Sequence, residues 1–144
     1  MEIKTTGNVL VTAKIENLQD LLDVERGTLS QDQVRFVEVS NALVDTGATM
    51  LSLPKRFIQE LSLVRFRTRR VRTVAGVIEV GIYGAVRLSI QDRDFTTDVA
   101  EVPDDCPVLI GQIPLEALDF VVDPCGQKLI GNPEHGGEQM IEIF

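Results

Sequence analysis

The sequence is poor in the residue types on which many enzymes depend. It has one histidine, His135, no tryptophan, one tyrosine and two cysteines. A single histidine excludes metal sites built from several histidines, and a histidine-based triad would have to use His135, which lies in a glycine-rich stretch. We expect His135 in a surface loop instead. Cys106 and Cys125 are too few for a disulfide framework, so we expect two free thiols with no nucleophilic role.

Long hydrophobic runs are also absent. No stretch reaches the roughly 18 apolar residues that a membrane helix needs. The first four residues do not open a leader peptide, so we expect a cytoplasmic protein with no membrane partner. The formal net charge of −8 is unfavourable for neutralising phosphates, which argues against nucleic acid as a partner.

The composition that remains is ordinary for a globular protein, with 44% hydrophobic and 25% charged residues. A length of 144 residues predicts a single domain over residues 1–144. Short alternating or β-branched segments, separated by turn residues, predict about eight or more strands in a mainly β sandwich or barrel. The expected strand segments are 3–15 (one or two strands), 34–39, 42–44, 64–73, 77–83, 85–90, 95–102, 108–111, 121–124 with 128–130 as a hairpin, and 140–144. Gly81 and Gly84 are expected to be bulges or bends.

Helix signals are few. Residues 51–61 begin with Ser52 as a candidate N-cap and Pro54 in the first turn, and residues 114–120 have the strongest helical pattern. Residues 17–25 are either a short helix or a loop with a turn. The strand-like segment 64–73 carries five arginines, which we interpret as a solvated strand face, with a binding role as the alternative. The acidic turns at 92–94 and 104–105 are expected to be solvated, so we predict no metal site.

One motif indicates chemistry. The apolar run that ends at Leu43-Val44 leads directly into Asp45-Thr46-Gly47-Ala48. Residues 108–111, Val108-Leu109-Ile110-Gly111, form a second apolar run that ends in glycine and precedes the helix predicted at 114–120. Between them, Thr73-Val74-Ala75-Gly76-Val77 has the composition of a hairpin tip. In this order the features resemble the retropepsin-like aspartic proteases, in their cellular and bacterial branch, from about Val34 to Phe144.

The resemblance implies a mainly β, closed acid-protease barrel with one short C-terminal helix. It implies that Asp45 is the catalytic residue and that Thr46, Gly47 and Ala48 support its loop, with Thr46 bonding across a twofold axis. Val74, Ala75 and Gly76 would form a flap over an extended peptide. Val108, Leu109, Ile110 and Gly111 would support the catalytic loop from behind.

Amide hydrolysis by water needs both a base and an acid, and two carboxylates that share one proton supply both. This chain has one Asp-Thr-Gly and room for one lobe, so the second carboxylate must come from another subunit. We therefore predict a homodimeric aspartic endopeptidase that needs no cofactor, acts on peptide or protein substrates, and favours apolar side chains beside the cut. The C-terminal Met140–Phe144 strand is expected to pair with its mate in the dimer.

Some residues depart from the viral pattern, because Thr49 and Met50 follow Ala48 and Gln112 follows Gly111. The segment before Gln33 is also longer than in the compact viral enzymes, and we expect it to add a strand or to cover the site. One alternative is a noncatalytic peptide-binding or regulatory dimer of the same fold. Another is a small monomeric β domain in which the motif occurs by chance.

Overall fold

The computed structural model describes residues 8–141 and 143, in which strands dominate. The strands are β1 (Val9–Asn17), β2 (Phe36–Val44), β3 (Leu51–Pro54), β4 (Val64–Thr73), β5 (Gly76–Ile90), β6 (Arg93–Val102), β7 (Leu109–Ile110), β8 (Phe120–Asp123) and β9 (Lys128–Gly131). The helices are α1 (Leu18–Glu25), α2 (Lys55–Glu60) and α3 (Gln112–Leu118), with short 3₁₀ turns η2 (Gln31–Gln33) and η3 (Pro133–His135). The mainly β prediction is confirmed. The described chain has two helices besides the predicted C-terminal one, and the β8–β9 hairpin follows α3.

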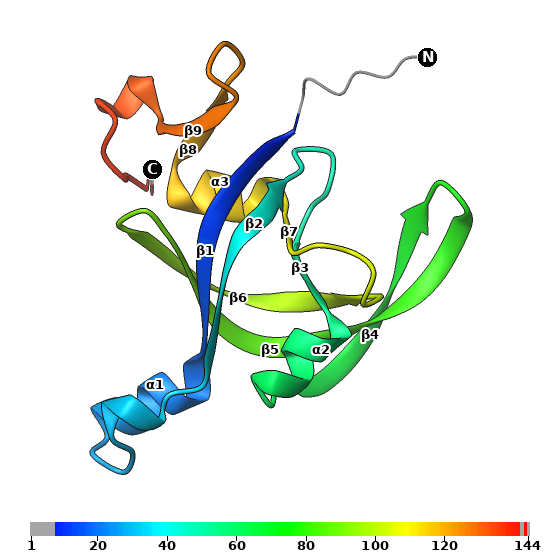
Figure 1. The fold of residues 1–144 in the computed structure, drawn as a ribbon, viewed down its shortest axis with the longest axis vertical. Coiled ribbons are helices and arrows are strands. Elements are labelled where there is room, and N and C mark those ends of the chain that lie inside the picture. The colour runs from blue at the N-terminus through cyan, green and yellow to red at the C-terminus, as the bar shows by residue number, and fades with distance from the viewer. Residues whose placement is uncertain (1–7, 142, 144) are drawn as a thin grey trace.

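Seven strands form one sheet in the order β1-β2-β7-β3-β6-β5-β4, while β8 and β9 pair separately. The C-terminal half of β1 also pairs with β5, from Lys14 opposite Ser89 to Asn17 opposite Val86. The pairings therefore lead from β1 around the sheet and back to β1, and β4 remains at an edge. Figure 1 shows the β4–β5 hairpin standing away from the rest of the molecule.

The core follows the two-residue period of the strands. Along β5, Ile82, Val86, Leu88 and Ile90 are buried. The last three belong to a core cluster with apolar residues of the neighbouring strands and of α3. The irregularity expected near Gly84 is present, because the β5–β6 register shifts between Tyr83 and Val86. Gly81, by contrast, pairs in regular register with Thr68.

The helix predicted to begin at Ser52 is wrong in its first turn. Leu51–Pro54 is the strand β3, which lies between β7 and β6, and all four of its residues are buried. Only the pairing with these distant strands distinguishes such a buried strand from a helix start, and α2 begins after Pro54. The segments predicted separately at 34–39 and 42–44 fall in the single strand β2, except for residues 34 and 35, which precede it.

The two chain ends differ from their predictions in other ways. The predicted strand over 3–15 is β1 from Val9 onward, and its part before Asn8 lies outside the described residues. The following segment is the helix α1, capped by the Asn17 side chain, which accepts a hydrogen bond from the Asp20 amide. Of the predicted strand 140–144, Met140, Ile141 and Ile143 are in no strand, and Glu142 and Phe144 are outside the described residues.

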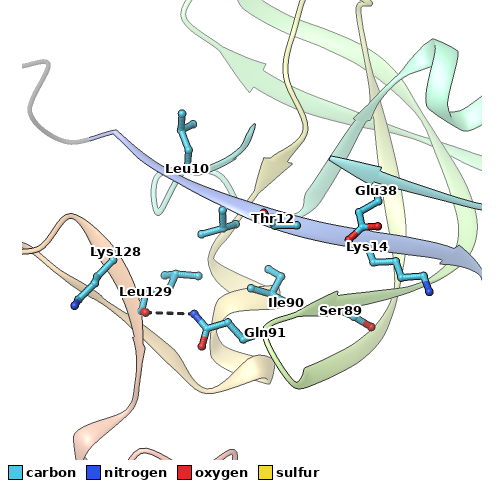
Figure 2. A pocket seen from close by; sticks show the side chains of 10 residues that line it. Leu10, Thr12, Lys14, Glu38, Ser89, Ile90, Gln91, Lys128 and Leu129 are labelled. Carbon is cyan, nitrogen blue, oxygen red and sulfur yellow. Dashed lines mark hydrogen bonds between the residues drawn. The ribbon is translucent and has the colours of Figure 1, made fainter. Parts of the chain in front are cut away.

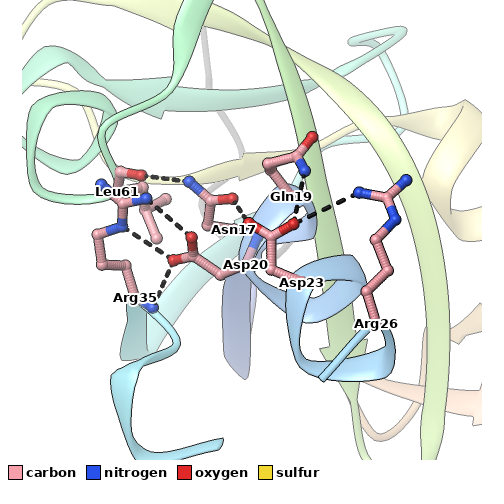
Figure 3. Close-up of polar contacts among 7 residues, drawn as sticks. All are labelled: Asn17, Gln19, Asp20, Asp23, Arg26, Arg35 and Leu61. Atoms are coloured by element: carbon pink, nitrogen blue, oxygen red, sulfur yellow. Dashed lines mark hydrogen bonds and ion pairs between the residues drawn. The ribbon is translucent and has the colours of Figure 1, made fainter. Parts of the chain in front are cut away.

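Polar groups anchor α1 to the sheet. The buried Asp20 carboxylate accepts hydrogen bonds from the backbone N–H of Arg35 and from its guanidinium, at 2.8–3.0 Å (Figure 3). Asn17 also donates from its side chain to the carbonyl of Leu61. The Arg35 guanidinium holds the pKa of Asp20 below its ordinary value, which outweighs the opposite effect of burial. The segment before Gln33 thus adds the strand β1 to the sheet, as one of the two predicted possibilities, and it also forms the helix α1.

Candidate active site

The Asp45 loop begins where β2 ends. The backbone N–H of Asp45 donates to the carbonyl of Ile110 at 3.0 Å, which fixes the start of the loop against β7. One carboxylate oxygen of Asp45 accepts from the Gly47 N–H at 3.0 Å, and the Asp45 carbonyl accepts from the Ala48 N–H. These bonds form a tight turn that leaves the Asp45 side chain half-buried and Thr46 exposed. The second carboxylate oxygen has no hydrogen-bond partner among the described residues.

The residues predicted to support this loop lie directly behind it. β7 pairs in parallel with β2, with Leu109 opposite Leu43 and Ile110 opposite Val44. The chain then continues along the far side of the loop, where the Gln112 N–H donates to the carbonyl of Ala48 at 2.8 Å.

Gly111 is the point of closest approach between these two segments. A Cβ atom at this position would lie 2.6 Å from the carbonyl oxygen of Met50. Its own N–H donates to that carbonyl at 3.1 Å. A side chain would therefore push the supporting segment away from the Asp45 loop.

The predicted flap residues form the tip of the β4–β5 hairpin. Val74 and Ala75 are the two turn residues, and Thr73 pairs with Gly76 across the turn. The Thr73 hydroxyl accepts from the Ala75 N–H at 3.1 Å and donates to the Gly76 carbonyl at 2.9 Å. Gly76 has φ of +121°, a conformation that favours glycine. Val74 is fully exposed at the end of the hairpin.

A cleft of about 570 Å³ separates the loop from the hairpin. Gly47, Ala48 and Thr49 border it on the loop side, and Arg70–Thr73 with Val80 border it on the hairpin side. Its floor comes from Ser52 of β3 and from Ala100, Glu101 and Val102 of β6. Asp45 and the tip residues 74–76 do not line this cleft. The structure thus brings the loop and the hairpin arm together across an open, largely apolar groove.

Sequence reasoning did not identify Glu101, which lines this cleft, or its hydrogen-bond partner Tyr83. The Tyr83 hydroxyl donates to the Glu101 carboxylate at 3.0 Å, and Glu101 lines the cleft. Burial is the main cause that raises the pKa of Tyr83, and the neighbouring Glu101 adds to it. Only the alternation of the strand over residues 95–102 could have placed Glu101, and nothing in that alternation pointed to the cleft.

A second hollow of about 600 Å³ contains none of the predicted site residues. It lies among β1, the end of β5, the following turn and β9, where Gln91 donates to the Leu129 carbonyl at 3.5 Å (Figure 2). Within the described part of the chain, no group of histidine, cysteine or acidic residues is arranged to hold a metal ion.

The surface position expected for His135 is wrong. Its side chain is 15% exposed, and Nδ1 lies 2.5 Å from the Asp119 carboxylate. Asp119 ends α3 in the left-handed conformation, so its carboxylate points to the segment that returns through η3. This contact is the main cause that lowers the pKa of Asp119, and hydrogen bonds from Asn132 and Met140 add to it.

Cys106 and Cys125 are free thiols, as expected.

None of the described helices combines the length and the apolar character needed to cross a membrane.

Comparison with known proteins bears directly on the Asp45 loop. The family described as "gag-polyprotein putative aspartyl protease" matches residues 37–117, which contain the Asp45 loop, the hairpin and β7. No curated protein sequence matches this chain significantly. Because the match covers more than half of the sequence, the chain belongs to this aspartyl protease family.

Proposed function

We propose that the protein is an aspartic endopeptidase that acts as a homodimer, with Asp45 of each subunit forming the catalytic pair. The observation that carries this proposal is the Asp45 loop itself. One of its carboxylate oxygens has no hydrogen-bond partner among the described residues, the loop borders a peptide-sized cleft, and its motif occurs once in the chain. A pair of carboxylates needs a second copy, because the sequence contains only one Asp-Thr-Gly.

The chemistry follows from two carboxylates that share one proton, since like charges at close range cannot both ionise. The ionised Asp45 takes a proton from water while the water oxygen attacks the peptide carbonyl carbon. The protonated Asp45 of the other subunit gives its proton to the carbonyl oxygen. The tetrahedral intermediate then collapses, its C–N bond breaks, and the leaving amine takes a proton from the pair. No metal, cofactor or covalent enzyme intermediate enters these steps.

The neighbours of Asp45 have supporting roles. The Gly47 N–H holds one carboxylate oxygen, and the small Ala48 leaves room for the substrate backbone. Thr46 is exposed at the tip of the loop, where a hydroxyl can reach the same loop of a second subunit. Val108 to Gly111 keep the loop in place through the backbone bonds described above. The return of the strand pairings to β1 supports a closed barrel as the rigid frame.

The substrate is an extended peptide that lies between the Asp45 loop and the hairpin. Val71, Val80, Ala100 and Val102 make much of the cleft wall apolar, which favours apolar side chains beside the cut. Val74, Ala75 and Gly76 close over the peptide as a flap. The exposed Met140, Ile141 and Ile143 contribute to the dimer contact. If deletion of residues 140–144 leaves the dimer intact, this last assignment is wrong.

The test is cleavage of an unstructured peptide library between about pH 4 and 7, the range suited to a shared-proton pair. We expect the wild type to cleave and Asp45→Asn not to cleave. Asp92→Asn, which changes an exposed carboxylate in the β5–β6 turn, is the matched control and should retain activity. Analytical ultracentrifugation of the same samples establishes the dimer. A dimeric wild type that binds peptides without cleaving any would instead identify a noncatalytic binding module.

A further inference from the structure

The outer edge of β4 is exposed and chemically distinctive. Within the part of the chain that the structure describes, β4 pairs only with β5. Nine of its ten residues are exposed, Val71 being half-buried. Five of them form what we call the arginine strand: Arg65, Arg67, Arg69, Arg70 and Arg72. An unpaired strand edge offers backbone N–H and C=O groups to an incoming strand. This edge therefore combines a free backbone with five cationic side chains.

Among the described residues, the arginine strand differs from most of the other arginines in forming no ion pair with an acidic side chain. The chain has five other arginines, and each is engaged: Arg26, Arg35, Arg56 and Arg87 pair with carboxylates, and Arg93 donates to backbone carbonyls. Across residues 8–141, none of the arginine-strand guanidinium groups forms an ion pair. Arg70 lies opposite Glu79 in register without forming an ion pair, and Arg67 stacks on the Phe66 ring. Five arginines without an ion pair in that range thus gather on one strand of a chain whose net charge is −8.

The register divides these charges between the two faces of the hairpin. Arg67 and Arg69 lie on the face that they share with Val71, whereas Arg70 and Arg72 lie on the opposite face. A strand added to β4 would also point its side chains alternately to the two faces. Acidic residues along such a strand would therefore meet arginines on both faces, and opposite charges across neighbouring strands are stabilising.

We propose that the arginine strand is a docking edge for an acidic, extended segment of a partner polypeptide, which adds to the sheet beside β4. This binding does not depend on cleavage by Asp45. Charge complementarity and the open backbone edge select the occupant together. A nucleic acid would meet the charges alone, because it cannot extend the backbone hydrogen bonds, and the net charge of −8 would repel its phosphates.

The edge also adjoins the cleft. Arg70 and Arg72 line the groove between the hairpin and the Asp45 loop, so a segment docked on β4 ends near the mouth of that groove. A partner bound here would be held beside the cleft, and an acidic stretch next to a cut site would recruit that protein as a substrate. Arg67 and Arg69 lie outside the cleft lining and report on docking alone.

The experiment measures fluorescence anisotropy of labelled peptides of about ten residues, the length of a long strand. The protein used is the Asp45→Asn variant, so that cleavage does not consume the probe. The first peptide repeats glutamate-glutamate-threonine-threonine, which places glutamates on both faces of an added strand, and the second has glutamine in place of glutamate. A third has N-methyl groups on every backbone nitrogen of the acidic sequence, which keeps its charges but removes the N–H donors from both edges of the strand.

We expect the acidic peptide to bind at least about tenfold more tightly than the glutamine and N-methylated peptides. Binding should weaken between about 0.05 and 0.5 M salt, because the contacts are exposed. Arg67→Gln with Arg69→Gln should weaken binding several-fold, as should Arg70→Gln with Arg72→Gln, since the added strand meets both faces. Arg26→Gln, which changes an exposed arginine on α1's C-terminal side, is the matched control and should leave binding unchanged.

Three results would overturn the proposal. Equal affinity for the acidic and glutamine peptides would mean that the arginines only keep the edge soluble. Equal affinity for the acidic and N-methylated peptides, with stronger competition by a short single-stranded DNA, would indicate a polyanion patch. Loss of binding with only one of the two double variants would exclude strand addition. Each result stands whether or not the wild type proves to be a protease.

Discussion

At the scale of single residues, Gly111 couples the supporting segment to the Asp45 loop. A Cβ atom would meet the Met50 carbonyl oxygen at 2.6 Å and the Met50 nitrogen at 2.7 Å, and backbone atoms cannot move aside cheaply. We expect Gly111→Ala to lower the free energy of unfolding by about 1–3 kcal/mol, measured by urea titration. Gly126→Ala is the control, because only ends of flexible side chains lie within reach there. If Gly111→Ala and Gly126→Ala were equally stable, the Asp45 loop would be able to shift and accommodate the added methyl group.

A second residue-scale prediction concerns Asp20 and pH. Its pKa is lowered in the folded protein, mainly by the hydrogen bonds from Arg35. The ionised group therefore stabilises the fold above its ordinary pKa of about 3.9, and this contribution is lost as pH falls through the folded value. At neutral pH, Asp20→Asn should cost about 1–3 kcal/mol. The difference from wild type should shrink on acidification in urea titrations, whereas a difference independent of pH would contradict the ion pair.

At the scale of elements, the polar contacts around Asp119 hold the C-terminal segment against α3. One carboxylate oxygen receives both His135 and the Met140 N–H, and the other receives the Asn132 side chain. An amide has one oxygen and cannot accept all three, so Asp119→Asn should speed amide hydrogen exchange at Met140 several-fold. Asp123→Asn, at the end of β8, is the control and should leave that amide unchanged. Unchanged exchange in both variants would mean that other contacts hold the segment.

The elements that sequence could predict are those with local signals. The β4–β5 hairpin has alternating strands around a turn, and α3 has helical spacing, so both were found to within a few residues. β3 was missed because Leu51–Pro54 is surrounded by β7 and β6, which are distant in sequence. The position of His135 was missed for the same reason, since its partner Asp119 precedes it by a whole hairpin.

At the scale of the whole molecule, the order of motifs indicated the Asp45 loop, its supporting strand and the hairpin. In the structure the loop and the hairpin arm border one groove, the supporting strand lies behind the loop, and the tip residues 74–76 do not line the groove. The cleft floor could not be predicted, because Glu101 and its neighbours reach the site only through the parallel pairing of β6 with β3. The same pattern holds for the arginine strand, whose composition was plain in the sequence. The sequence could not show that these arginines form no ion pair among the described residues, because ion pairing depends on tertiary contacts. The structure shows this contrast with Arg35, Arg56 and Arg87, which do pair with carboxylates.

The last prediction tests whether catalysis belongs to the dimer. If the active site needs one Asp45 from each subunit, a mixed dimer of wild type and Asp45→Asn has an incomplete pair. Random exchange of equal amounts makes about one quarter of the dimers wild type in both subunits. At constant total protein, cleavage should therefore fall to about a quarter of the wild-type rate, following the square of the wild-type fraction. Mixing with Asp92→Asn should leave the rate unchanged. A fall only to one half would mean that each chain cleaves independently, and the second carboxylate would then have to lie within the same chain.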